Sequence, residues 1–351
     1  MNVVVLTPGF AASKADTTCI PVLQSLLFAL HQQHSANINI QIVSFQYPFT
    51  KGSYDWNGIS CWSAGGSNRK FPARWKTWYS VIRFLKRFHE KKPIDIIHAF
   101  WLTECTLVGK WAAGITGAKL ICHAMGQDVL PSNRYMKHIH PSTLNILTIS
   151  EYAARQLQKN FGIKDALAVP MGLNIDDFKG LQFNEERHTD ILGVGSLIPL
   201  KNYRLFVSLF AQLAKEFPGL TGRIIGDGVE KEPLMKLIHE SGLQEQLLLE
   251  GKLDRRDVLQ MMTHSRILLH PSQFESAGYV FLEALYAGMK IVGFDTGFLP
   301  DLPEANICND EDEMLNTLRK LLTQKLSHRQ VMVHSIQDTA NTVFDYYKKV
   351  I

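Results

Sequence analysis

Strand-like runs alternate with helix-like runs along the chain, and this alternation constrains the fold more than any other feature. The expected strands of the first half are NVVVLTP, INIQIVSF, IDIIHAF, AKLICHAM and LNILTIS, with helices at about 20–33, 75–90, 103–115 and 151–160. In the second half, helices separate TDILGVGSL, LTGRIIGDG, QLLLEGKL, RILLHPS and KIVGFD. Strands spaced by helices pair in parallel and are covered on both faces. The chain is therefore predicted to be α/β, with two Rossmann-like doubly wound domains.

Domain boundaries are expected where this alternation is interrupted. The chain has 351 residues, more than one hydrophobic core usually organises. The polar stretch MGLNIDDFKGLQFNEERHTD lacks a clear period, so residues 1–172 are expected to form an N-terminal domain, 173–188 a linker and 189–327 a C-terminal domain. Helices are expected at 328–351, and their return to the N-terminal domain is left open. Open parallel sheets bind ligands at the carboxyl ends of their strands, so two facing domains would share a central cleft.

Composition and charge exclude several classes of protein. With 46% apolar and 20% charged residues the chain has an ordinary globular composition, and no run of 18 apolar residues predicts a membrane span. The N-terminus lacks the basic start of a signal peptide, and five scattered cysteines without CxxC spacing indicate free thiols, so a cytoplasmic location is expected. Through Leu173 there are 18 Lys/Arg and 8 Asp/Glu, giving +10, against −6 for the rest. The first half is therefore expected to face something acidic.

Two glutamates with seven residues between them stand in QFESAGYVFLEALYAG, residues 273–288. The preceding RILLHPS is expected to be a buried strand, and apolar residues from about Ala277 to Gly288 fall at helical spacing. Glu275 would then lie in the strand-to-helix loop and Glu283 almost two turns further along. Both could point toward a ligand at the amino end of the helix, where free amides favour an anion. The alternative is a loop carboxylate and a solvated helix carboxylate.

Two glycine turns precede this motif. GVGSLIPLKNYRLF places Gly195 and Ser196 at a strand end, with Lys201 and Arg204 at the start of a helix. Turn amides and a lysine could cradle a diphosphate, although a solvated Lys201 is the plain alternative. A dinucleotide fingerprint is disfavoured, since its third glycine is missing. IIGDGVEKEPL repeats the theme with the turn 226–228, a weak signal by itself.

These motifs, in this order and ahead of GFDTGFLPD, resemble the C-terminal half of glycosyltransferase family 4, retaining enzymes of the GT-B fold. The family's hallmark is two glutamates with seven residues between them in a proline-serine, glutamate, glycine and glutamate-alanine frame. Here the frame is Pro271-Ser272, Glu275, Gly278 and Glu283-Ala284. The resemblance covers about residues 190–302. The N-terminal half matches more loosely, through DIIHAF, CHAMGQD, ILTISEYAARQL and VPMGLNIDDF.

The resemblance implies a metal-independent hexosyltransferase that moves a sugar from a nucleotide-diphosphate sugar to a glycan or lipid-linked glycan of the cell envelope. The first domain would serve the acceptor and the second the donor. The catalytic residues would be Glu275 against the transferred sugar, Lys201 at the departing phosphate and His123 facing sugar and acceptor. Glu283 would hydrogen-bond the ribose. The other substrate-binding positions would be Gly9, Phe10, Gly126, Asp128, Gly195, Ser196, Arg204, Gly226, Asp227, Gly228, Lys252, Leu253, Ser276, Ala277, Gly278 and Tyr279.

Some alternatives stay open beside this hypothesis. His123 could be a core histidine, and Ser196 stands where many family members have an arginine. No cofactor, metal or nucleic acid is expected, because the DxD-like Asp310-Glu311-Asp312 precedes an expected helix, where acids are favoured. The rival functions are a nicotinamide-dependent oxidoreductase, a nucleotide-sugar isomerase or epimerase, and a sugar-binding relative without catalysis.

A basic, aromatic segment occupies residues 69–92, which we call the basic stripe. It holds nine basic residues and one acid, Glu90, with six aromatic residues interleaved. On a helix, Trp75, Trp78, Ile82 and Leu85 would share one face. This pattern is typical of a helix that lies on an anionic membrane, and it equally suits a helix that packs on the core with solvated charges. Peripheral association with the inner face of the membrane is therefore left open.

Overall fold

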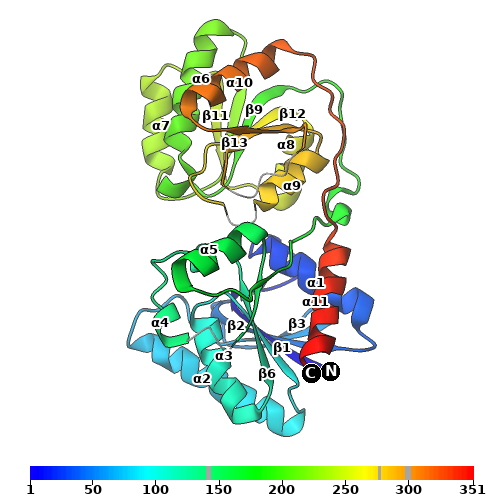
Figure 1. The fold of residues 1–351 in the computed structure, drawn as a ribbon. Coiled ribbons are helices and arrows are strands. Elements are labelled where there is room, and N and C mark those ends of the chain that lie inside the picture. Colours follow the sequence, from blue (N-terminus) through cyan, green and yellow to red (C-terminus); the bar gives the residue numbers. More distant parts are fainter. Residues whose placement is uncertain (140–143, 276–277, 297–301) are drawn as a thin grey trace. The chain divides into compact units, whose positions relative to one another are not determined.

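The computed structural model describes residues 1–139, 144–275, 278–296 and 302–351. It divides into two compact units: Met1–Gly172 with His334–Ile351, and Leu173–Val333. Each unit contains a largely parallel β-sheet flanked by helices, which confirms the predicted α/β class (Figure 1). Residues 173–188, expected to be a linker, belong to the second unit because Leu173 and Phe178 are buried in its core. Because the residues around Leu173 and Phe178 are polar, the sequence pattern did not indicate that these two side chains are buried.

The first unit alternates strands and helices as the sequence predicts, with additions. Its strands are β1 (Asn2–Gly9), β2 (Asn39–Tyr47), β3 (Gly52–Trp56), β4 (Ile59–Ser63), β5 (Ile96–Phe100), β6 (Lys119–Ala124), β7 (Asn145–Thr148) and β8 (Leu167–Ala168). Its helices are α1 (Pro21–His34), α2 (Ala73–Lys91), α3 (Glu104–Thr116), the short η1 (Gln127–Val129) and α4 (Met136–Ile139), α5 (Glu151–Phe161) and α11 (Ile336–Val350). The described strands pair in the order β3-β4-β2-β1-β5-β6-β7-β8.

Among the described strands of this sheet, β3 and β4 form the one antiparallel pair, and the turn between them has a local cause. Asn57 and Gly58 both have positive φ, 52° and 83°. Asn-Gly with two positive φ values makes the tight turn that matches the twist of paired strands. The hairpin adds an edge to a sheet that is otherwise parallel.

Helix α11 returns to the first unit from the far end of the chain. It packs beside α1 (red and blue in Figure 1), where His34 stacks on Phe344 with ring centroids 3.9 Å apart. Thr339 fixes the crossing, since its Oγ1 donates to the carbonyl of Pro170 and accepts from the amide of Gly172. Gly172 has no room for a side chain, because a Cβ there would lie 2.0 Å from the carbonyl of Ser335.

The second unit is a parallel sheet with helices on its faces. Its strands are β9 (Thr189–Val194), β10 (Gly222–Ile225), β11 (Leu247–Gly251), β12 (Ser265–His270), β13 (Lys290–Phe294) and β14 (Ala305–Cys308), in the order β11-β10-β9-β12-β13-β14. Its helices are η3 (Ile175–Phe178), η4 (Pro199–Lys201), α6 (Tyr203–Glu216), α7 (Lys231–Glu240), α8 (Arg255–Thr263), α9 (Tyr279–Tyr286) and α10 (Glu311–Thr323). Because β9 and β12 are neighbours, the loops that follow them meet at one edge.

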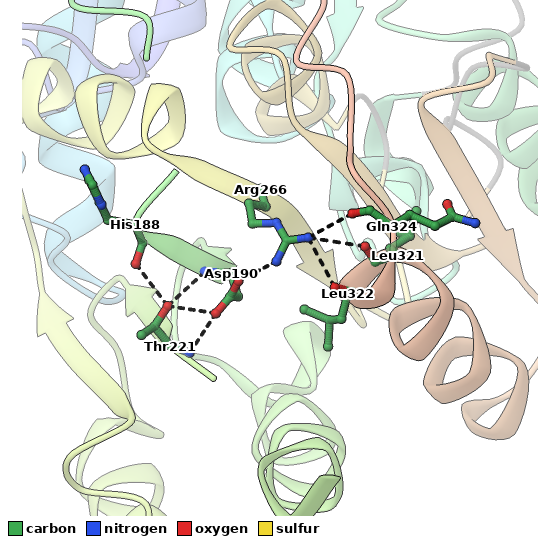
Figure 2. A network of polar contacts seen from close by, with 7 residues as sticks. All are labelled: His188, Asp190, Thr221, Arg266, Leu321, Leu322 and Gln324. Carbon is green, nitrogen blue, oxygen red and sulfur yellow. Dashed lines mark hydrogen bonds and ion pairs between the residues drawn. The ribbon is translucent and has the colours of Figure 1, made fainter. Parts of the chain in front are cut away.

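A polar network braces the opposite edge of this sheet, where β9 and β12 begin (Figure 2). Asp190 accepts from Thr221 through Oδ2 and from Arg266 through Oδ1, at 3.1 and 2.7 Å. The same guanidinium donates to three carbonyls at the carboxyl end of α10, those of Leu321, Leu322 and Gln324. A cation at a helix carboxyl end is stabilising, because it satisfies carbonyls that have no partner within the helix.

Helix α2 carries most of the basic stripe and packs on its own unit. Trp78, Val81 and Leu85 are buried, whereas Trp75 is 54% exposed. The helix face that was expected to carry both Trp75 and Trp78 therefore packs against the unit, except in the first turn, where Trp75 is exposed. Within the described residues, no helix has both the length and the apolar character needed to cross a membrane.

Candidate functional site

Lys201 and Glu275 meet at the carboxyl edge of the second sheet. Lys201 ends η4, which follows β9, and Glu275 follows the neighbouring strand β12. The two loops are tied together next to this pair, because the carbonyl of Leu200 accepts from the amide of Gln273 and from Ser272 Oγ, at 3.0 and 3.3 Å. Lys201 Nζ then forms an ion pair with Glu275 Oε1. The structure thus brings together two residues that the sequence analysis assigned to one site.

His270, the last residue of β12, is the third member of this cluster. Its Nε2 lies 2.7 Å from Glu275 Oε1. Burial raises the pKa of Glu275, but the hydrogen bond from His270, together with the charge and hydrogen bond of Lys201, outweighs that effect and holds the pKa at about 2. Burial lowers the pKa of His270, so its imidazole is neutral at pH 7 and donates its Nε2 proton to the carboxylate. Glu275 is thus a fixed negative charge with a cation and a neutral donor against it.

Glu283 is buried on the second turn of α9 rather than solvated. Its Oε1 lies 2.6 Å from Arg255 Nη1, at the start of α8. Arg255 also donates to Asp177 Oδ2 through Nη2 at 2.7 Å, and its guanidinium carbon lies 5.5 Å from the centre of the Tyr279 ring. Burial raises the pKa of Glu283, and the charge of Arg255 offsets part of that rise. The alternative of a solvated helix carboxylate is therefore wrong for Glu283.

The glycine turns predicted as a diphosphate cradle touch each other closely. A Cβ on Gly226 would lie 1.9 Å from the carbonyl oxygen of Gly195, and one on Gly228 would lie 2.3 Å from that of Leu197. Backbone hydrogen bonds join the same loops, from Gly195 to Ile225 and from Leu197 to the carbonyl of Asp227. These glycines therefore permit close loop-to-loop packing at the strand ends. A role in binding a diphosphate stays a prediction.

The remaining predicted positions of the second unit are scattered around this edge. Arg204 forms an ion pair with Glu230 at 3.1 Å rather than with Glu275, and its side chain is half exposed. The exposed positions are Ser196, Asp227 and Lys252, while Leu253 is partly buried. Gly278 adopts a left-handed conformation with φ of 49° at the amino end of α9. Ser276 and Ala277 lie outside the described residues.

His123, on β6 of the first unit, is fully buried. Its ring is nearly parallel to that of His98, with centroids 5.4 Å apart, and it stacks against Phe100. Neither of its ring nitrogens has a hydrogen-bond partner among the residues that the structure describes. Burial lowers its pKa to about 3, so the imidazole is neutral. This burial fits the alternative of a core histidine, and a contact with substrate stays a prediction.

Asp128, predicted to contact substrate, organises its own loop. Its buried carboxylate accepts from the backbone amides of Leu102, Met125 and Gly126, at 2.8, 3.1 and 2.6 Å. The carboxylate therefore links the segments that follow β5 and β6, and the Gly126 amide already donates its hydrogen bond to Asp128. Burial raises the pKa of Asp128, with the amides opposing that rise.

Gly9 and Phe10, at the end of β1, belong to the interior of the first unit. The side chain of Phe10 is fully buried, and its ring packs edge-on against that of Trp56, with the ring centroids 4.9 Å apart. The backbone amide of Phe10 donates to the carbonyl of Tyr47. A Cβ on Gly9 would touch Cys19 and Tyr47 at ordinary contact distance. Phe10 therefore contributes to the core in this structure rather than presenting its ring to a ligand.

Sequence reasoning missed three members of the site: His270, Arg255 and Asp177. His270 could have been found as a polar residue at the carboxyl end of a buried strand. Asp177 and Arg255 stand in ordinary charged stretches, IDDF and DRRD, and gave no distinguishing signal. The acids at 310–312 have a local role, since Asp310 caps α10 by accepting from the amide of Glu313 at 2.8 Å. Within the described residues, no cluster of three His, Cys, Asp or Glu side chains could hold a metal ion.

Comparison with known proteins bears on the fold and on the family that the second unit resembles. The phosphatidylinositol N-acetylglucosaminyltransferase gpi3 subunit of Schizosaccharomyces pombe is 24% identical over 143 residues, which cover 40% of this chain and 31% of that protein. Sucrose-phosphate synthase from Thermosynechococcus elongatus aligns over 99% of this chain and 98% of its own, with a TM-score of 0.79 and 14% identity. Anabaena HepE in complex with UDP and glucose aligns over 99% and 95%, with a TM-score of 0.67 and 16% identity. Residues 175–337 match the family model Glycosyl transferases group 1, and the chain has the fold of the GT-B glycosyltransferases.

Proposed function

We propose that this protein is a glycosyltransferase that moves a hexosyl group from a nucleotide-diphosphate sugar to a glycan or lipid-linked glycan, with retention and without a metal ion. The pairing of Lys201 with Glu275 carries the proposal. It places one cation and one carboxylate side by side at the carboxyl ends of β9 and β12, the edge where open parallel sheets bind ligands. The match of residues 175–337 to Glycosyl transferases group 1 supports the same activity.

The cluster suits a reaction in which negative charge grows on a departing diphosphate. The bond between the anomeric carbon and the β-phosphate oxygen breaks, and the acceptor oxygen forms the new bond on the same face of the sugar. The leaving phosphate takes the proton of the acceptor hydroxyl. Lys201 would stabilise the charge that develops on the phosphate, and such preorganised stabilisation is usually the largest catalytic contribution. Because Glu275 remains ionised, it would accept hydrogen bonds from sugar hydroxyls.

Lys201 must serve two partners in this scheme. Its side chain is 19% exposed and already paired with Glu275, so its position is set before a donor arrives. Only interactions that are stronger in the transition state than in the bound donor accelerate the chemical step. A lysine held by Glu275 satisfies this condition, since its attraction to the phosphate rises as the bond breaks.

The second cluster would bind the nucleotide. Glu283 would accept from ribose hydroxyls through lone pairs that its contact with Arg255 leaves available. Arg255 is held at the same time by Asp177 and Tyr279, so the carboxylate keeps a neutralising partner whether or not a nucleotide is bound. A thermal-shift screen with nucleotides and nucleotide sugars identifies the nucleotide and the sugar that occupy the site.

The acceptor side of the proposal rests on the first unit. Arg83, Lys86 and Arg87 are exposed along α2, and basic side chains of this kind are attracted to anionic membranes. The named relative from Schizosaccharomyces pombe is an enzyme of phosphatidylinositol. A peripheral position on the inner face of the membrane, next to a lipid-linked acceptor of the cell envelope, is therefore part of the proposal.

A donor screen followed by product analysis tests the proposed transfer. Thermal shift with a panel of nucleotides and nucleotide sugars should identify one donor that stabilises the protein, as any ligand of the native state does. Release of nucleotide should then require an acceptor and should persist in chelator, and NMR of the product should show the anomeric configuration of the donor. A product that is an isomer of the donor would instead assign an epimerase. Strict metal dependence or an inverted product would contradict the mechanism.

A further inference from the structure

The first unit contains a cavity of about 750 Å³ between α2, α3 and the segment around α4. Its volume lies in the range of small-molecule sites, roughly 300–1,000 Å³. Among the described residues, every one that lines it belongs to the first unit, between Phe71 and His138. Neither the sequence analysis nor the proposed donor chemistry assigns it a role.

The walls of the cavity are aromatic and largely open to solvent. Trp75, Phe71 and Trp111 are 54%, 55% and 37% exposed. The rings of Trp75 and Trp111 are nearly parallel, 5° apart, and come from different helices. The floor is Trp78, which is buried and held by a 2.6 Å hydrogen bond from Nε1 to Glu104 Oε2. The rings are therefore positioned by the fold rather than loosely placed.

The charges around these rings are cationic. Arg74 and Arg134 are the cationic residues that line the cavity, next to the imidazole of His138, and no carboxylate is among the described residues that line it. Glu104, the acid that contacts the floor residue Trp78, is buried and already accepts from Gln46 and Trp78. Its charge is balanced by Arg74, whose Nε lies 3.6 Å from Glu104 Oε2.

Arg134 is the cation that remains available to a ligand. It is exposed, and it forms no ion pair with any residue that the structure describes. A guanidinium group binds a carboxylate in a planar, bidentate manner. The cavity is therefore complementary to a ligand that combines a negative charge with flat, weakly polar faces.

We propose that this cavity binds an acidic glycan, whose pyranose rings stack on Trp75 and Trp111 and carry carboxylates that pair with Arg134. The C–H groups on one face of a pyranose pack well against an indole, whereas the sugar hydroxyls reach outward to solvent. An aromatic cage for a cationic ligand is disfavoured, because the guanidinium groups would repel it. An acyl chain is disfavoured as well, since Leu107 is the one aliphatic side chain among the described lining residues. The proposal does not depend on sugar transfer, because the site is tested without a donor.

The test compares two tetrasaccharides of equal length. Hyaluronan tetrasaccharide carries carboxylates, and chitotetraose is neutral. Calorimetry on the full chain should show binding of the acidic sugar at least about fivefold tighter in about 50 mM salt, with the difference shrinking in about 300 mM salt as screening increases. Three of the six tryptophans line the cavity, so the same titration should change the intrinsic fluorescence.

Two exposed residues provide variants that should fold normally. Trp75→Ala should weaken binding of the acidic tetrasaccharide about tenfold, because the truncation removes an aromatic face on which a sugar ring stacks. Arg134→Gln should remove the preference for the acidic sugar and leave weak binding of both. Phe49→Ala and Arg155→Gln are matched controls, because Phe49 is 61% exposed and Arg155 is exposed, and neither lines the cavity. Both controls should bind as the wild type does.

Three results would overturn the proposal. The first is an absence of binding for both sugars, and the second is equal, salt-independent binding of the two. The third is that phosphatidylglycerol vesicles bind through Trp75 and Arg134, while hyaluronan tetrasaccharide does not bind. That outcome would make the cavity a lipid-contact surface. Because none of these measurements contains a nucleotide, their failure would leave the proposed transfer reaction intact.

Discussion

Arg255 Nη1 and Glu283 Oε1 lie 2.6 Å apart, and the same arginine also binds Asp177. The carboxylate expected to hold a ribose is therefore buried together with its own counter-charge. Removing one partner of a buried ion pair leaves the other uncompensated, which typically costs about 3–5 kcal/mol. A test of Glu283 must separate this loss of stability from a loss of nucleotide binding.

Glu283→Gln makes that separation, because glutamine keeps the shape and one carbonyl acceptor. The dissociation constant of the bound nucleotide should rise about tenfold or more, since hydrogen bonds to a charged group contribute about 1.5–3 kcal/mol. Titration calorimetry gives the constant, and circular dichroism confirms folding. The control is Glu304→Gln, which removes a glutamate paired with Lys290 at 3.5 Å on the same unit. Unchanged affinity in Glu283→Gln would remove this residue from the nucleotide site.

Lys201→Ala should lower turnover more than it lowers donor affinity. Loss of a group that stabilises developing charge typically costs about a hundredfold in kcat, and KM should change much less because the gain is realised in the transition state. Steady-state kinetics with the identified donor measure both. Lys236→Ala, an exposed lysine of α7, serves as the control. Turnover near that of the wild type would move the role of phosphate partner to Arg204 or another cation.

Gly226→Ala should destabilise the second unit. The added methyl group would lie 1.9 Å from the carbonyl oxygen of Gly195, so two backbone segments must separate. Overpacking against backbone costs about 1–3 kcal/mol, which denaturant unfolding can resolve. Gly219→Ala is the matched control, because nothing lies within 4 Å of the methyl group at that position. Equal stability of the two variants would show that the loops do not pack as described.

His123 should make the stability of the protein depend on pH. Burial lowers its pKa to about 3 in the native state, whereas an unfolded histidine titrates near 6.5. Below pH 6.5 the unfolded chain therefore binds a proton that the native state does not, and stability falls as the pH decreases toward 3. In His123→Gln, the dependence of the unfolding free energy on pH should be shallower by about 1.4 kcal/mol per pH unit near pH 5. Identical slopes would mean that the imidazole is accessible to protons in the native state.

The basic stripe gives the test of membrane association. Arg83, Lys86 and Arg87 are exposed, and each basic residue near an anionic surface contributes about 1 kcal/mol. Changing the three to glutamine should reduce sedimentation with anionic vesicles, while wild-type binding should weaken in high salt and be absent with neutral vesicles. Arg155→Gln, Lys159→Gln and Lys164→Gln together give a control of equal charge on the same unit. Wild-type protein that remains in the supernatant would assign α2 to core packing alone.

The fold was largely predictable, because periodicity reports burial directly. Strands such as IDIIHAF and RILLHPS appear in the structure as β5 and β12, within a residue or two. The hairpin of β3 and β4 was missed although Asn57-Gly58 carries a recognised turn signal, since its strands are short and interrupted by polar residues. Strand β14 was missed for the same reason, as it has four residues.

The candidate site was predictable only where a motif marked it. Glu275 and Glu283 were found through their spacing, but their charged partners come from other loops, and a distant pairing leaves no local pattern. Arg255 reads as a solvated residue at a helix start until the fold places it against Glu283. The buried side chains of Phe10 and Asp128 show the opposite case, in which a motif position has a structural task. The cavity of the first unit joins side chains of three segments, so no single stretch of sequence could reveal it.

Arg266 joins Asp190 to the carboxyl end of α10 at the edge where the strands begin (Figure 2). This polar brace of the second unit thus lies at the edge opposite the loops that carry Lys201 and Glu275. Mutations that reshape those loops should therefore leave this brace intact. In the laboratory this predicts that loops from other donor specificities can be grafted onto the strand ends, and that the grafted chains will fold. The same separation would let natural selection exchange one sugar for another without rebuilding the domain.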